Sequence, residues 1–175
     1  MPSFLMHLAI AKRYLEKGGK VDNQRDFFDA SILPDIAMDK VKSHYRKNDD
    51  KVCMINRANG KVDLDKFLRT HILDNDLNRG VYLHLYADSC YYKNLPVEYL
   101  KNATAEDFLR DNFYTFSFYE DFVAKKYNVS LDLTIYKRAI EIIMKEKKDF
   151  KKDAKLLLTE SEIIDFIETV SSIKI

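Results

Sequence analysis

The chain has 175 residues, 46% of them hydrophobic, which is enough for one domain with an apolar core over residues 1–175. Its 29 basic and 28 acidic residues give a formal net charge of +1, which excludes a global electrostatic attraction to nucleic acid or to an anionic membrane. The two cysteines, Cys53 and Cys90, lack the CxxC spacing of a zinc ribbon and do not suggest a disulfide framework.

No segment approaches ~20 uninterrupted apolar residues, so we expect no membrane span. The apolar segment at the N-terminus has no basic leader and contains His7, so we interpret it as a helix of the fold rather than a signal peptide. The expected location is the cytoplasm.

Glycine (4 residues) and proline (3 residues) are scarce, and apolar residues recur at spacings of three and four. Both features predict an all-α protein. The first helix is expected over Phe4–Glu16 and should end at the pair Gly18-Gly19. Further along, Pro34 predicts that Leu33 is extended or ends a helix, which places Asp35 at a helix entrance or a turn.

The second half of the chain carries several helix-start signals. We expect a surface loop over 47–51 and Asp63 as the cap of a helix over about 64–73. Asn75 or Asp76 should open the helix that follows, and Thr104 begins a capping box before a helix that reaches Tyr127, with a possible break near residue 114. A helix over about 133–147 and a final helix from the capping box at Thr159 to about residue 171 complete the expected order.

The most informative feature is the pair His84 and Asp88. Four residues apart on a helix, the imidazole and the carboxylate share one face. Leu77, Val81, Tyr91 and Leu95 would continue that face as an apolar stripe. A polar pair directed at a core needs a partner there, so the pair is either a hydrogen-bonded structural pair or part of a metal site.

Other ligand-type residues precede this pair: an early histidine, His7, then the segments Ser31–Ile36 and Ser43–Tyr45. In this order, and followed by Gly80-Val81-Tyr82-Leu83-His84-Leu85-Tyr86-Ala87-Asp88, they resemble the zinc-dependent phospholipase C and P1-type nuclease superfamily, and most closely its short bacterial members of undefined activity. The resemblance covers roughly residues 7–127, which would form a metal-site core over about 4–127, with C-terminal helices over about 131–175. The family's first motif has a glycine where this chain has Ala30.

The resemblance implies a cluster of one or two Zn²⁺ ions, although other divalent transition metals also suit mixed histidine and aspartate ligands. By position, one metal would be held by Asp35, His44, His84 and Asp88. Asp88 would bridge to a second metal supported by His7. Glu120 is a peripheral candidate for a third metal, but Asn94 and Phe116 stand near the positions where the family uses histidines for it.

The implied activity is hydrolysis of a phosphoester, with a small phosphoester or a phospholipid-type molecule as the substrate and Asp35 as a possible general base. The alternative is a non-catalytic helical protein that keeps the fold and at most a structural metal. We expect His71 to be a hydrogen-bonded boundary residue and Cys90 to be a small buried residue. The lysine-rich run over 145–152 is interpreted as a solvated segment, so no stable nucleic-acid binding is expected.

Overall fold

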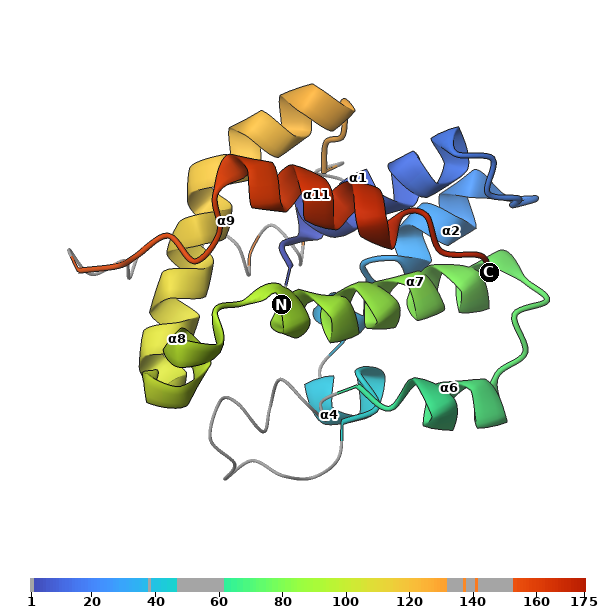
Figure 1. Cartoon of the computed structure of the whole chain (residues 1–175). Coiled ribbons are helices and arrows are strands. Elements are labelled where there is room, and N and C mark those ends of the chain that lie inside the picture. Colours follow the sequence, from blue (N-terminus) through green and yellow to red (C-terminus); the bar gives the residue numbers. More distant parts are fainter. Residues whose placement is uncertain (1, 38, 47–61, 132–136, 138–140, 142–152) are drawn as a thin grey trace.

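The computed structural model describes residues 2–37, 39–46, 62–131, 137, 141 and 153–175, and within these ranges the chain is mostly helical, with no strand (Figure 1). This confirms the all-α class for the described residues. The elements in chain order are α1 (Phe4–Glu16), α2 (Gln24–Ala30), α3 (Leu33–Ile36), α4 (Lys40–Ser43), α6 (Leu64–Thr70), α7 (Asp76–Tyr91), the 3-10 turn η1 (Tyr92–Asn94), α8 (Val97–Asn102), α9 (Ala105–Tyr127) and α11 (Glu160–Val170). None of the described helices has both the length and the apolar character that a bilayer crossing requires.

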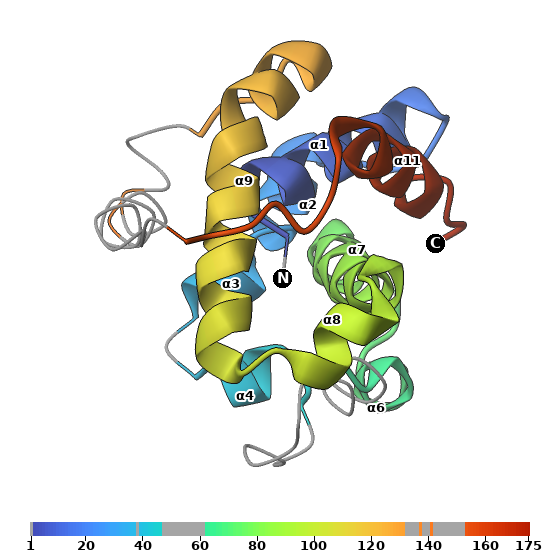
Figure 2. The ribbon, with the colours of Figure 1, turned by 60° about the vertical axis from the view of Figure 1, so that its left-hand side comes forward.

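Helix α1 is the central element of the core. It packs against α2, α7, α9 and α11, and Figures 1 and 2 both place α11 alongside it. Every residue from Phe4 to Ala11 is buried, because neighbouring helices cover this part of α1 on all sides. The Ser3 hydroxyl accepts a hydrogen bond from the backbone N–H of Met6 at the start, and Gly18 adopts a left-handed φ of 90° beyond the end. The predicted bounds of this helix are confirmed.

Helices α2 and α7 approach each other unusually closely at Gly80. A Cβ atom on Gly80 would lie 2.4 Å from the carbonyl oxygen of Phe27 and 2.7 Å from the Cβ of Ala30. Only glycine therefore allows this crossing without a shift of the helices. The contact fixes the end of α2 against the second turn of α7, one turn before His84.

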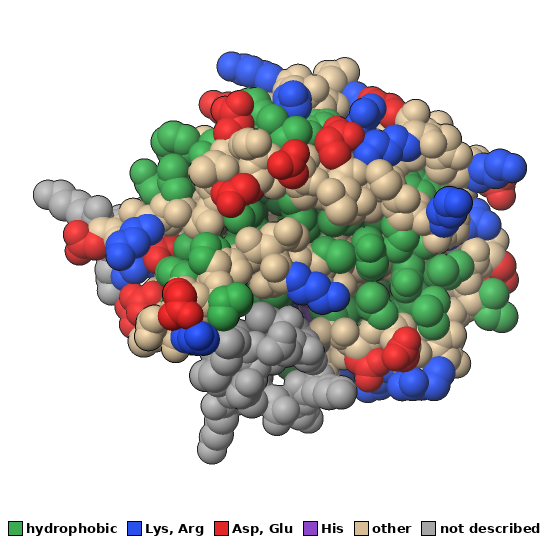
Figure 3. All heavy atoms as spheres, viewed as in Figure 1, with side chains coloured by type: hydrophobic (Ala, Val, Ile, Leu, Met, Phe, Trp, Pro, Cys, Tyr) green, Lys and Arg blue, Asp and Glu red, His purple; other side chains and the backbone are tan. Residues whose placement is uncertain are grey.

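The apolar stripe predicted for α7 is only partly correct. Tyr91 and Leu95 are buried, but Val81 is half-buried and Leu77 is 50% exposed. Residue 77 lies in the first turn of α7, which follows a loop that contains the exposed Ile72. Hydrophobic side chains gather over this part of α6 and α7 on the surface shown in Figure 3.

The capping predictions were accurate. Asp63, Asn75, Thr104 and Thr159 each accept a hydrogen bond from the third residue along, and both predicted capping boxes form. The suggested break in α9 near Tyr114 is wrong, because α9 is continuous until Asn128, which ends it in a left-handed conformation.

Three expectations about short segments need correction. Leu33 begins α3 instead of being extended or ending a helix, because a proline in the first turn loses no helical hydrogen bond. Helix α6 ends at Thr70, since His71 is extended, and the short helices α4 and α8 were not predicted. The loop predicted over 47–51 and the lysine-rich run lie outside the described residues, as does most of the helix predicted over 133–147.

Candidate metal centre

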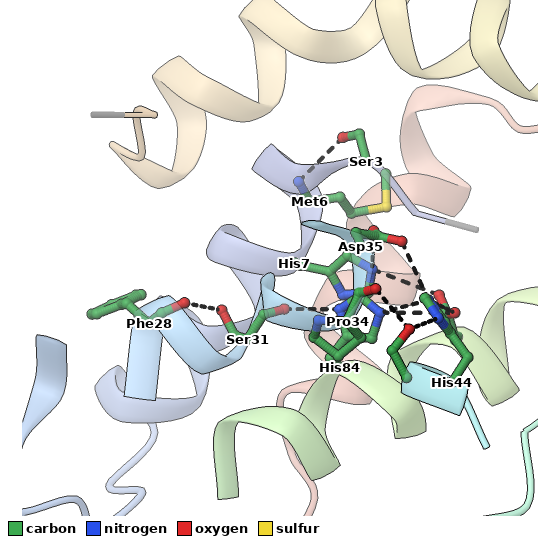
Figure 4. Close-up of polar contacts among 11 residues, drawn as sticks. Ser3, Met6, His7, Phe28, Ser31, Pro34, Asp35, His44 and His84 are labelled. Atoms are coloured by element: carbon green, nitrogen blue, oxygen red, sulfur yellow. Dashed lines mark hydrogen bonds and ion pairs between the residues drawn. The ribbon is translucent and has the colours of Figure 1, made fainter. Parts of the chain in front are cut away.

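The structure brings together five of the six side chains that the sequence nominated as metal ligands. We call this group the His–Asp cluster; its members are His7, Asp35, His44, His84 and Asp88. They come from α1, α3, the residue after α4, and α7, so four segments converge on one point, as Figure 4 shows for the three imidazoles and the carboxylate of Asp35. Each is at most 4% exposed, so their polar atoms need partners inside the protein.

The packing of α1 against α7 aligns two of the imidazoles. The rings of His7 and His84 are stacked, with centroids 3.9 Å apart and planes 19° apart. His84 and Asp88 are one helical turn apart, so both face the same side of α7. Pro34 precedes Asp35 in the first turn of α3, which lies against α2 and α7 and so presents the carboxylate to the cluster.

His44 is positioned by the end of α4. The backbone N–H of Tyr45 bonds to the carbonyl of Lys42 (3.1 Å), and that of Arg46 to the carbonyl of Val41 (2.9 Å), which is the Schellman pattern. Tyr45 occupies the left-handed position with a φ of 51°, where glycine is usual. Its ring packs edge-on against Phe67, so side-chain packing offsets the backbone strain.

The two carboxylates lie between the imidazoles. The Nε2 atom of His44 is 3.3 Å from Asp35 Oδ1 and 3.5 Å from Asp88 Oδ2, and His84 Nε2 is 3.9 Å from the same Asp88 oxygen. On the other side, His7 Nε2 is 3.8 Å from Asp35 Oδ2 and 3.6 Å from Asp88 Oδ1. The separations to Asp88 exceed those of good N–H···O bonds, so this carboxylate lies near the imidazoles without a short hydrogen bond to them.

Hydrogen bonds on the outer side fix the orientation of two imidazoles. His84 Nδ1 lies 2.9 Å from the carbonyl oxygen of Ser31, which can only accept, so Nδ1 carries the proton. The hydroxyl of Ser43 donates to the carbonyl of Pro34 (2.9 Å) and is therefore an acceptor for His44 Nδ1 at 3.0 Å. In the neutral form, both rings then direct an Nε2 lone pair into the cluster.

These two lone pairs point at the same place. The Nε2 atoms of His44 and His84 are only 3.2 Å apart, and two facing lone pairs at that distance repel unless a cation or a proton lies between them. Two nitrogen ligands on one tetrahedral zinc ion are separated by ~3.3 Å, given Zn–N bonds of ~2.0–2.1 Å. The observed separation fits a pair of ligands on one ion.

Three buried atoms of the cluster have no hydrogen bond from any described residue: both oxygens of Asp88 and the Nε2 atom of His7. A buried carboxylate that accepts no hydrogen bond is costly and needs an explanation, of which a bound ion is one. The donor set of three imidazoles and two carboxylates is one that Zn²⁺ and other divalent transition metals accept. By these tests, the residues fit a metal ion.

The protonation states favour cation binding. Burial is the largest influence on His84 and, together with the neighbouring His7, lowers its pKa to about 3. Burial would raise the pKa of Asp35, but the imidazoles of His84, His44 and His7 outweigh it and lower that pKa to about 2. Burial would also raise the pKa of Asp88. The imidazoles outweigh this effect, with His7 3.6 Å away, and hold the pKa of Asp88 well below its usual range. At neutral pH the cluster thus offers two carboxylates and a neutral His84.

The sixth nominated ligand, Glu120, is not part of either of the two ligand groups found in the described residues. It is half-buried on α9. The two positions where the resemblance expects further histidines have other uses here. Phe116 is buried in the core, and the Asn94 amide donates to the carbonyl of Cys90 at 2.9 Å.

The remaining histidine and the described cysteine have structural surroundings. His71 stacks on Phe67, and its Nδ1 lies within hydrogen-bond distance of the Thr70 and Tyr45 hydroxyls (2.9 and 3.3 Å). It therefore helps to anchor Tyr45, next to His44. Cys90 is half-buried against the core rather than fully buried.

Sequence reasoning missed the groups that orient the ligands. The Ser31 and Pro34 carbonyls are backbone atoms, which carry no residue-type signal. Ser43 and Gly80 lie inside the motifs that were noted, but their roles depend on contacts with segments distant in the chain. A serine directly before a ligand histidine was the one available clue.

A scan against protein-family models, a search of curated proteins and a search of solved structures each found no match to this chain.

Proposed function

We propose that the His–Asp cluster is a divalent metal centre and that the protein is a metal-dependent hydrolase acting on a phosphoester in the cytoplasm. The observation that carries the proposal is the pair of facing Nε2 atoms, 3.2 Å apart, beside two buried carboxylates. Zn²⁺ suits this donor set best, since it takes imidazole nitrogen and carboxylate oxygen in tetrahedral geometry.

The order of the ligands along the chain supports the phosphoesterase part of the proposal. His7, Asp35, His44, His84 and Asp88 follow one another as in the phospholipase C and P1 nuclease superfamily, and their side chains lie close together. Membership of that superfamily is part of the proposal and rests on these residues.

A divalent ion in this centre would supply a nucleophile by lowering the pKa of a bound water, and positive charge for the phosphoryl oxygens. The chain's own residues hold and orient the site: His44 and His84 present nitrogen lone pairs, Ser43 and the Ser31 carbonyl fix their tautomers, and the aspartates balance positive charge. A general base works best with a pKa near the working pH. Because the pKa of Asp35 is about 2, we favour Asp35 as a ligand over Asp35 as the base.

A second candidate function is a purely structural metal in a non-catalytic helical protein. The nearly complete burial of all five side chains favours it, because a substrate needs access to at least one face of the metal. A structural metal stabilises the fold by linkage, by ~2.7 kcal/mol when its free concentration is 100 times Kd. Chelation would then lower the melting temperature markedly, without any loss of an enzymatic activity.

Turnover of a generic phosphodiester distinguishes the two functions. Protein stripped with a chelator and reloaded with Zn²⁺ or Mn²⁺ should hydrolyse bis(p-nitrophenyl) phosphate. His84→Ala should lose that turnover, and His71→Ala, a histidine outside the cluster, should keep it. A fully loaded protein with no turnover on any phosphoester class would refute the hydrolase and leave the structural metal.

A further inference from the structure

Each carboxylate of the His–Asp cluster has one oxygen near His44 and the other oxygen near His7. Asp35 directs Oδ1 toward His44 (3.3 Å) and Oδ2 toward His7 (3.8 Å). Asp88 does the same, with Oδ2 toward His44 (3.5 Å) and Oδ1 toward His7 (3.6 Å). The cluster therefore has two ends, a His44 end and a His7 end, and both carboxylates connect them.

His84 belongs to the His44 end. Its Nδ1 is bonded to the Ser31 carbonyl, so only Nε2 can bind a metal. That atom is 3.2 Å from His44 Nε2 and 3.9 Å from Asp88 Oδ2. One imidazole nitrogen ligates one ion, which leaves His7 as the histidine of the other end.

We propose that Asp35, alongside Asp88, bridges the two ions that the resemblance implies for this centre. The inference rests on the metal centre proposed above and goes beyond the resemblance, which assigns a bridge to Asp88 alone. It makes Asp35 the third protein ligand at the His7 end.

A single ion at the His44 end would not complete the cluster. It would leave His7 Nε2 and Asp88 Oδ1 buried with no hydrogen bond from a described residue. A second ion would take both atoms as ligands together with Asp35 Oδ2, and so would give His7 Nε2 and Asp88 Oδ1 a partner that they otherwise lack among the described residues. Carboxylates also link the paired metals of hydrolytic sites, which lie ~3.5–4 Å apart.

The two metal positions would differ in the number of coordination sites that the protein leaves open. The His44 end offers four protein ligands: His44, His84, Asp35 and Asp88. The His7 end offers three: His7, Asp35 and Asp88. Four protein ligands close a tetrahedral zinc site, whereas three leave one position for water or substrate. The ion at the His7 end is therefore the exchangeable one, where a phosphoryl oxygen would bind.

The test separates the two ends with variants of the full chain. His44→Gln leaves the His7 end, and His7→Gln leaves the His44 end. Adding Asp35→Asn in each background should lower the affinity for the remaining ion at least about tenfold. This affinity is measured by competition for Zn²⁺ with a chelating dye. Asp111→Asn, which alters a buried aspartate outside the cluster, is the matched control and should change neither affinity. Circular dichroism verifies folding of each variant.

A second measurement needs no substitution. The wild-type protein loaded with Mn²⁺ should bind two equivalents and show the spin-coupled electron paramagnetic resonance signal of bridged ions. If Asp35→Asn lowers the metal affinity in one background only, Asp35 is not a bridge and the inference is wrong. Wild-type protein that binds one equivalent also overturns the inference but leaves the proposed metal centre intact. Wild-type protein that binds none overturns both.

Discussion

Two buried polar clusters in this protein are built in opposite ways. The α9 polar cluster, formed by Asp111, Asn112 and Thr115, is hydrogen-bonded within the protein. Asp111 accepts from the Tyr99 hydroxyl, from Arg110 Nε and from the backbone N–H of Lys155, at 2.9–3.2 Å. Asn112 and Thr115 accept from Tyr91 and from the backbone of Leu157. In the His–Asp cluster, by contrast, Asp88 accepts no hydrogen bond from a described residue.

The difference is between a network whose hydrogen bonds are satisfied and a cluster in which those of Asp88 are not. The α9 polar cluster attaches the segment before α11 to α9, and its satisfied groups explain its burial without any ligand. The His–Asp cluster is equally buried, but both oxygens of Asp88 and His7 Nε2 have no hydrogen bond from a described residue, which selection for stability alone would not favour. We infer that its arrangement serves the binding of a cation.

The largest expected difference between the two clusters appears when one carboxylate is removed from each. Asp111→Ala leaves Arg110 Nε, the Tyr99 hydroxyl and the backbone N–H of Lys155 without their acceptor. It should lower the free energy of unfolding by about 3 kcal/mol while metal content is unchanged. Asp88→Asn should abolish metal binding but leave the stability of the metal-free protein equal or higher, because it removes a buried charge that accepts no hydrogen bond from a described residue. Urea unfolding in the presence of a chelator, with metal analysis, measures both. The reverse pattern would show that Asp88 is the structural carboxylate.

Gly80→Ala tests how the fold supports the cluster. The added Cβ would meet the Phe27 carbonyl at 2.4 Å and the Ser31 nitrogen at 3.1 Å, so α2 must move away from α7. We expect a loss of about 2 kcal/mol of stability from overpacking, and weaker metal binding because the Ser31 carbonyl shifts from His84. Gly18→Ala is the control: it should cost about 1 kcal/mol through its left-handed φ and leave metal affinity unchanged. Equal metal affinity in both variants would contradict the role of Ser31.

The metal-free protein should lose stability in mild acid. The pKa of His84 is lowered to about 3 by burial, whereas an unfolded histidine titrates near ~6.5. Between these pH values the unfolded state binds one more proton than the folded state. The contribution of His84 to the free energy of unfolding is therefore complete above pH ~6.5, and it falls by up to ~1.4 kcal/mol per pH unit below that value. Unfolding measured at pH 7, 6 and 5 with a chelator should show this slope, and His84→Gln should flatten it. An equal slope in the variant would contradict a buried neutral His84.

Ser43→Ala should have the smallest effect on stability and a selective effect on metal binding. The hydroxyl relays a hydrogen bond from His44 to the Pro34 carbonyl, so its loss frees the tautomer of His44. We expect metal affinity to fall about tenfold, with a stability change of about 1 kcal/mol in the metal-free protein. Ser43→Thr keeps the hydroxyl and should restore affinity. If Thr and Ala behave alike, the hydroxyl does not orient His44.

The sequence predicted local structure better than it predicted the site. Helix starts at Asn75, Thr104 and Thr159 were predictable because a capping bond joins residues three apart. The exposure of Leu77 was not predictable, since burial depends on which part of α7 the other helices cover. Convergence of the ligands was anticipated only through the motif order of a family, because periodicity cannot place His7 beside a residue 77 positions later. The carbonyls of Ser31 and Pro34 had no sequence signal at all.

Metal content is the most direct test of the central claim that the His–Asp cluster binds a divalent cation. It should be measured by inductively coupled plasma mass spectrometry on protein purified without chelator or affinity metal. We expect at least one equivalent of zinc or another transition metal per chain in the wild-type protein and in His71→Ala, and a lower metal content in His44→Ala, which lacks a ligand of the His44 end. A wild-type protein without metal, even after incubation with Zn²⁺ or Mn²⁺, or a His44→Ala variant with undiminished metal, would contradict it.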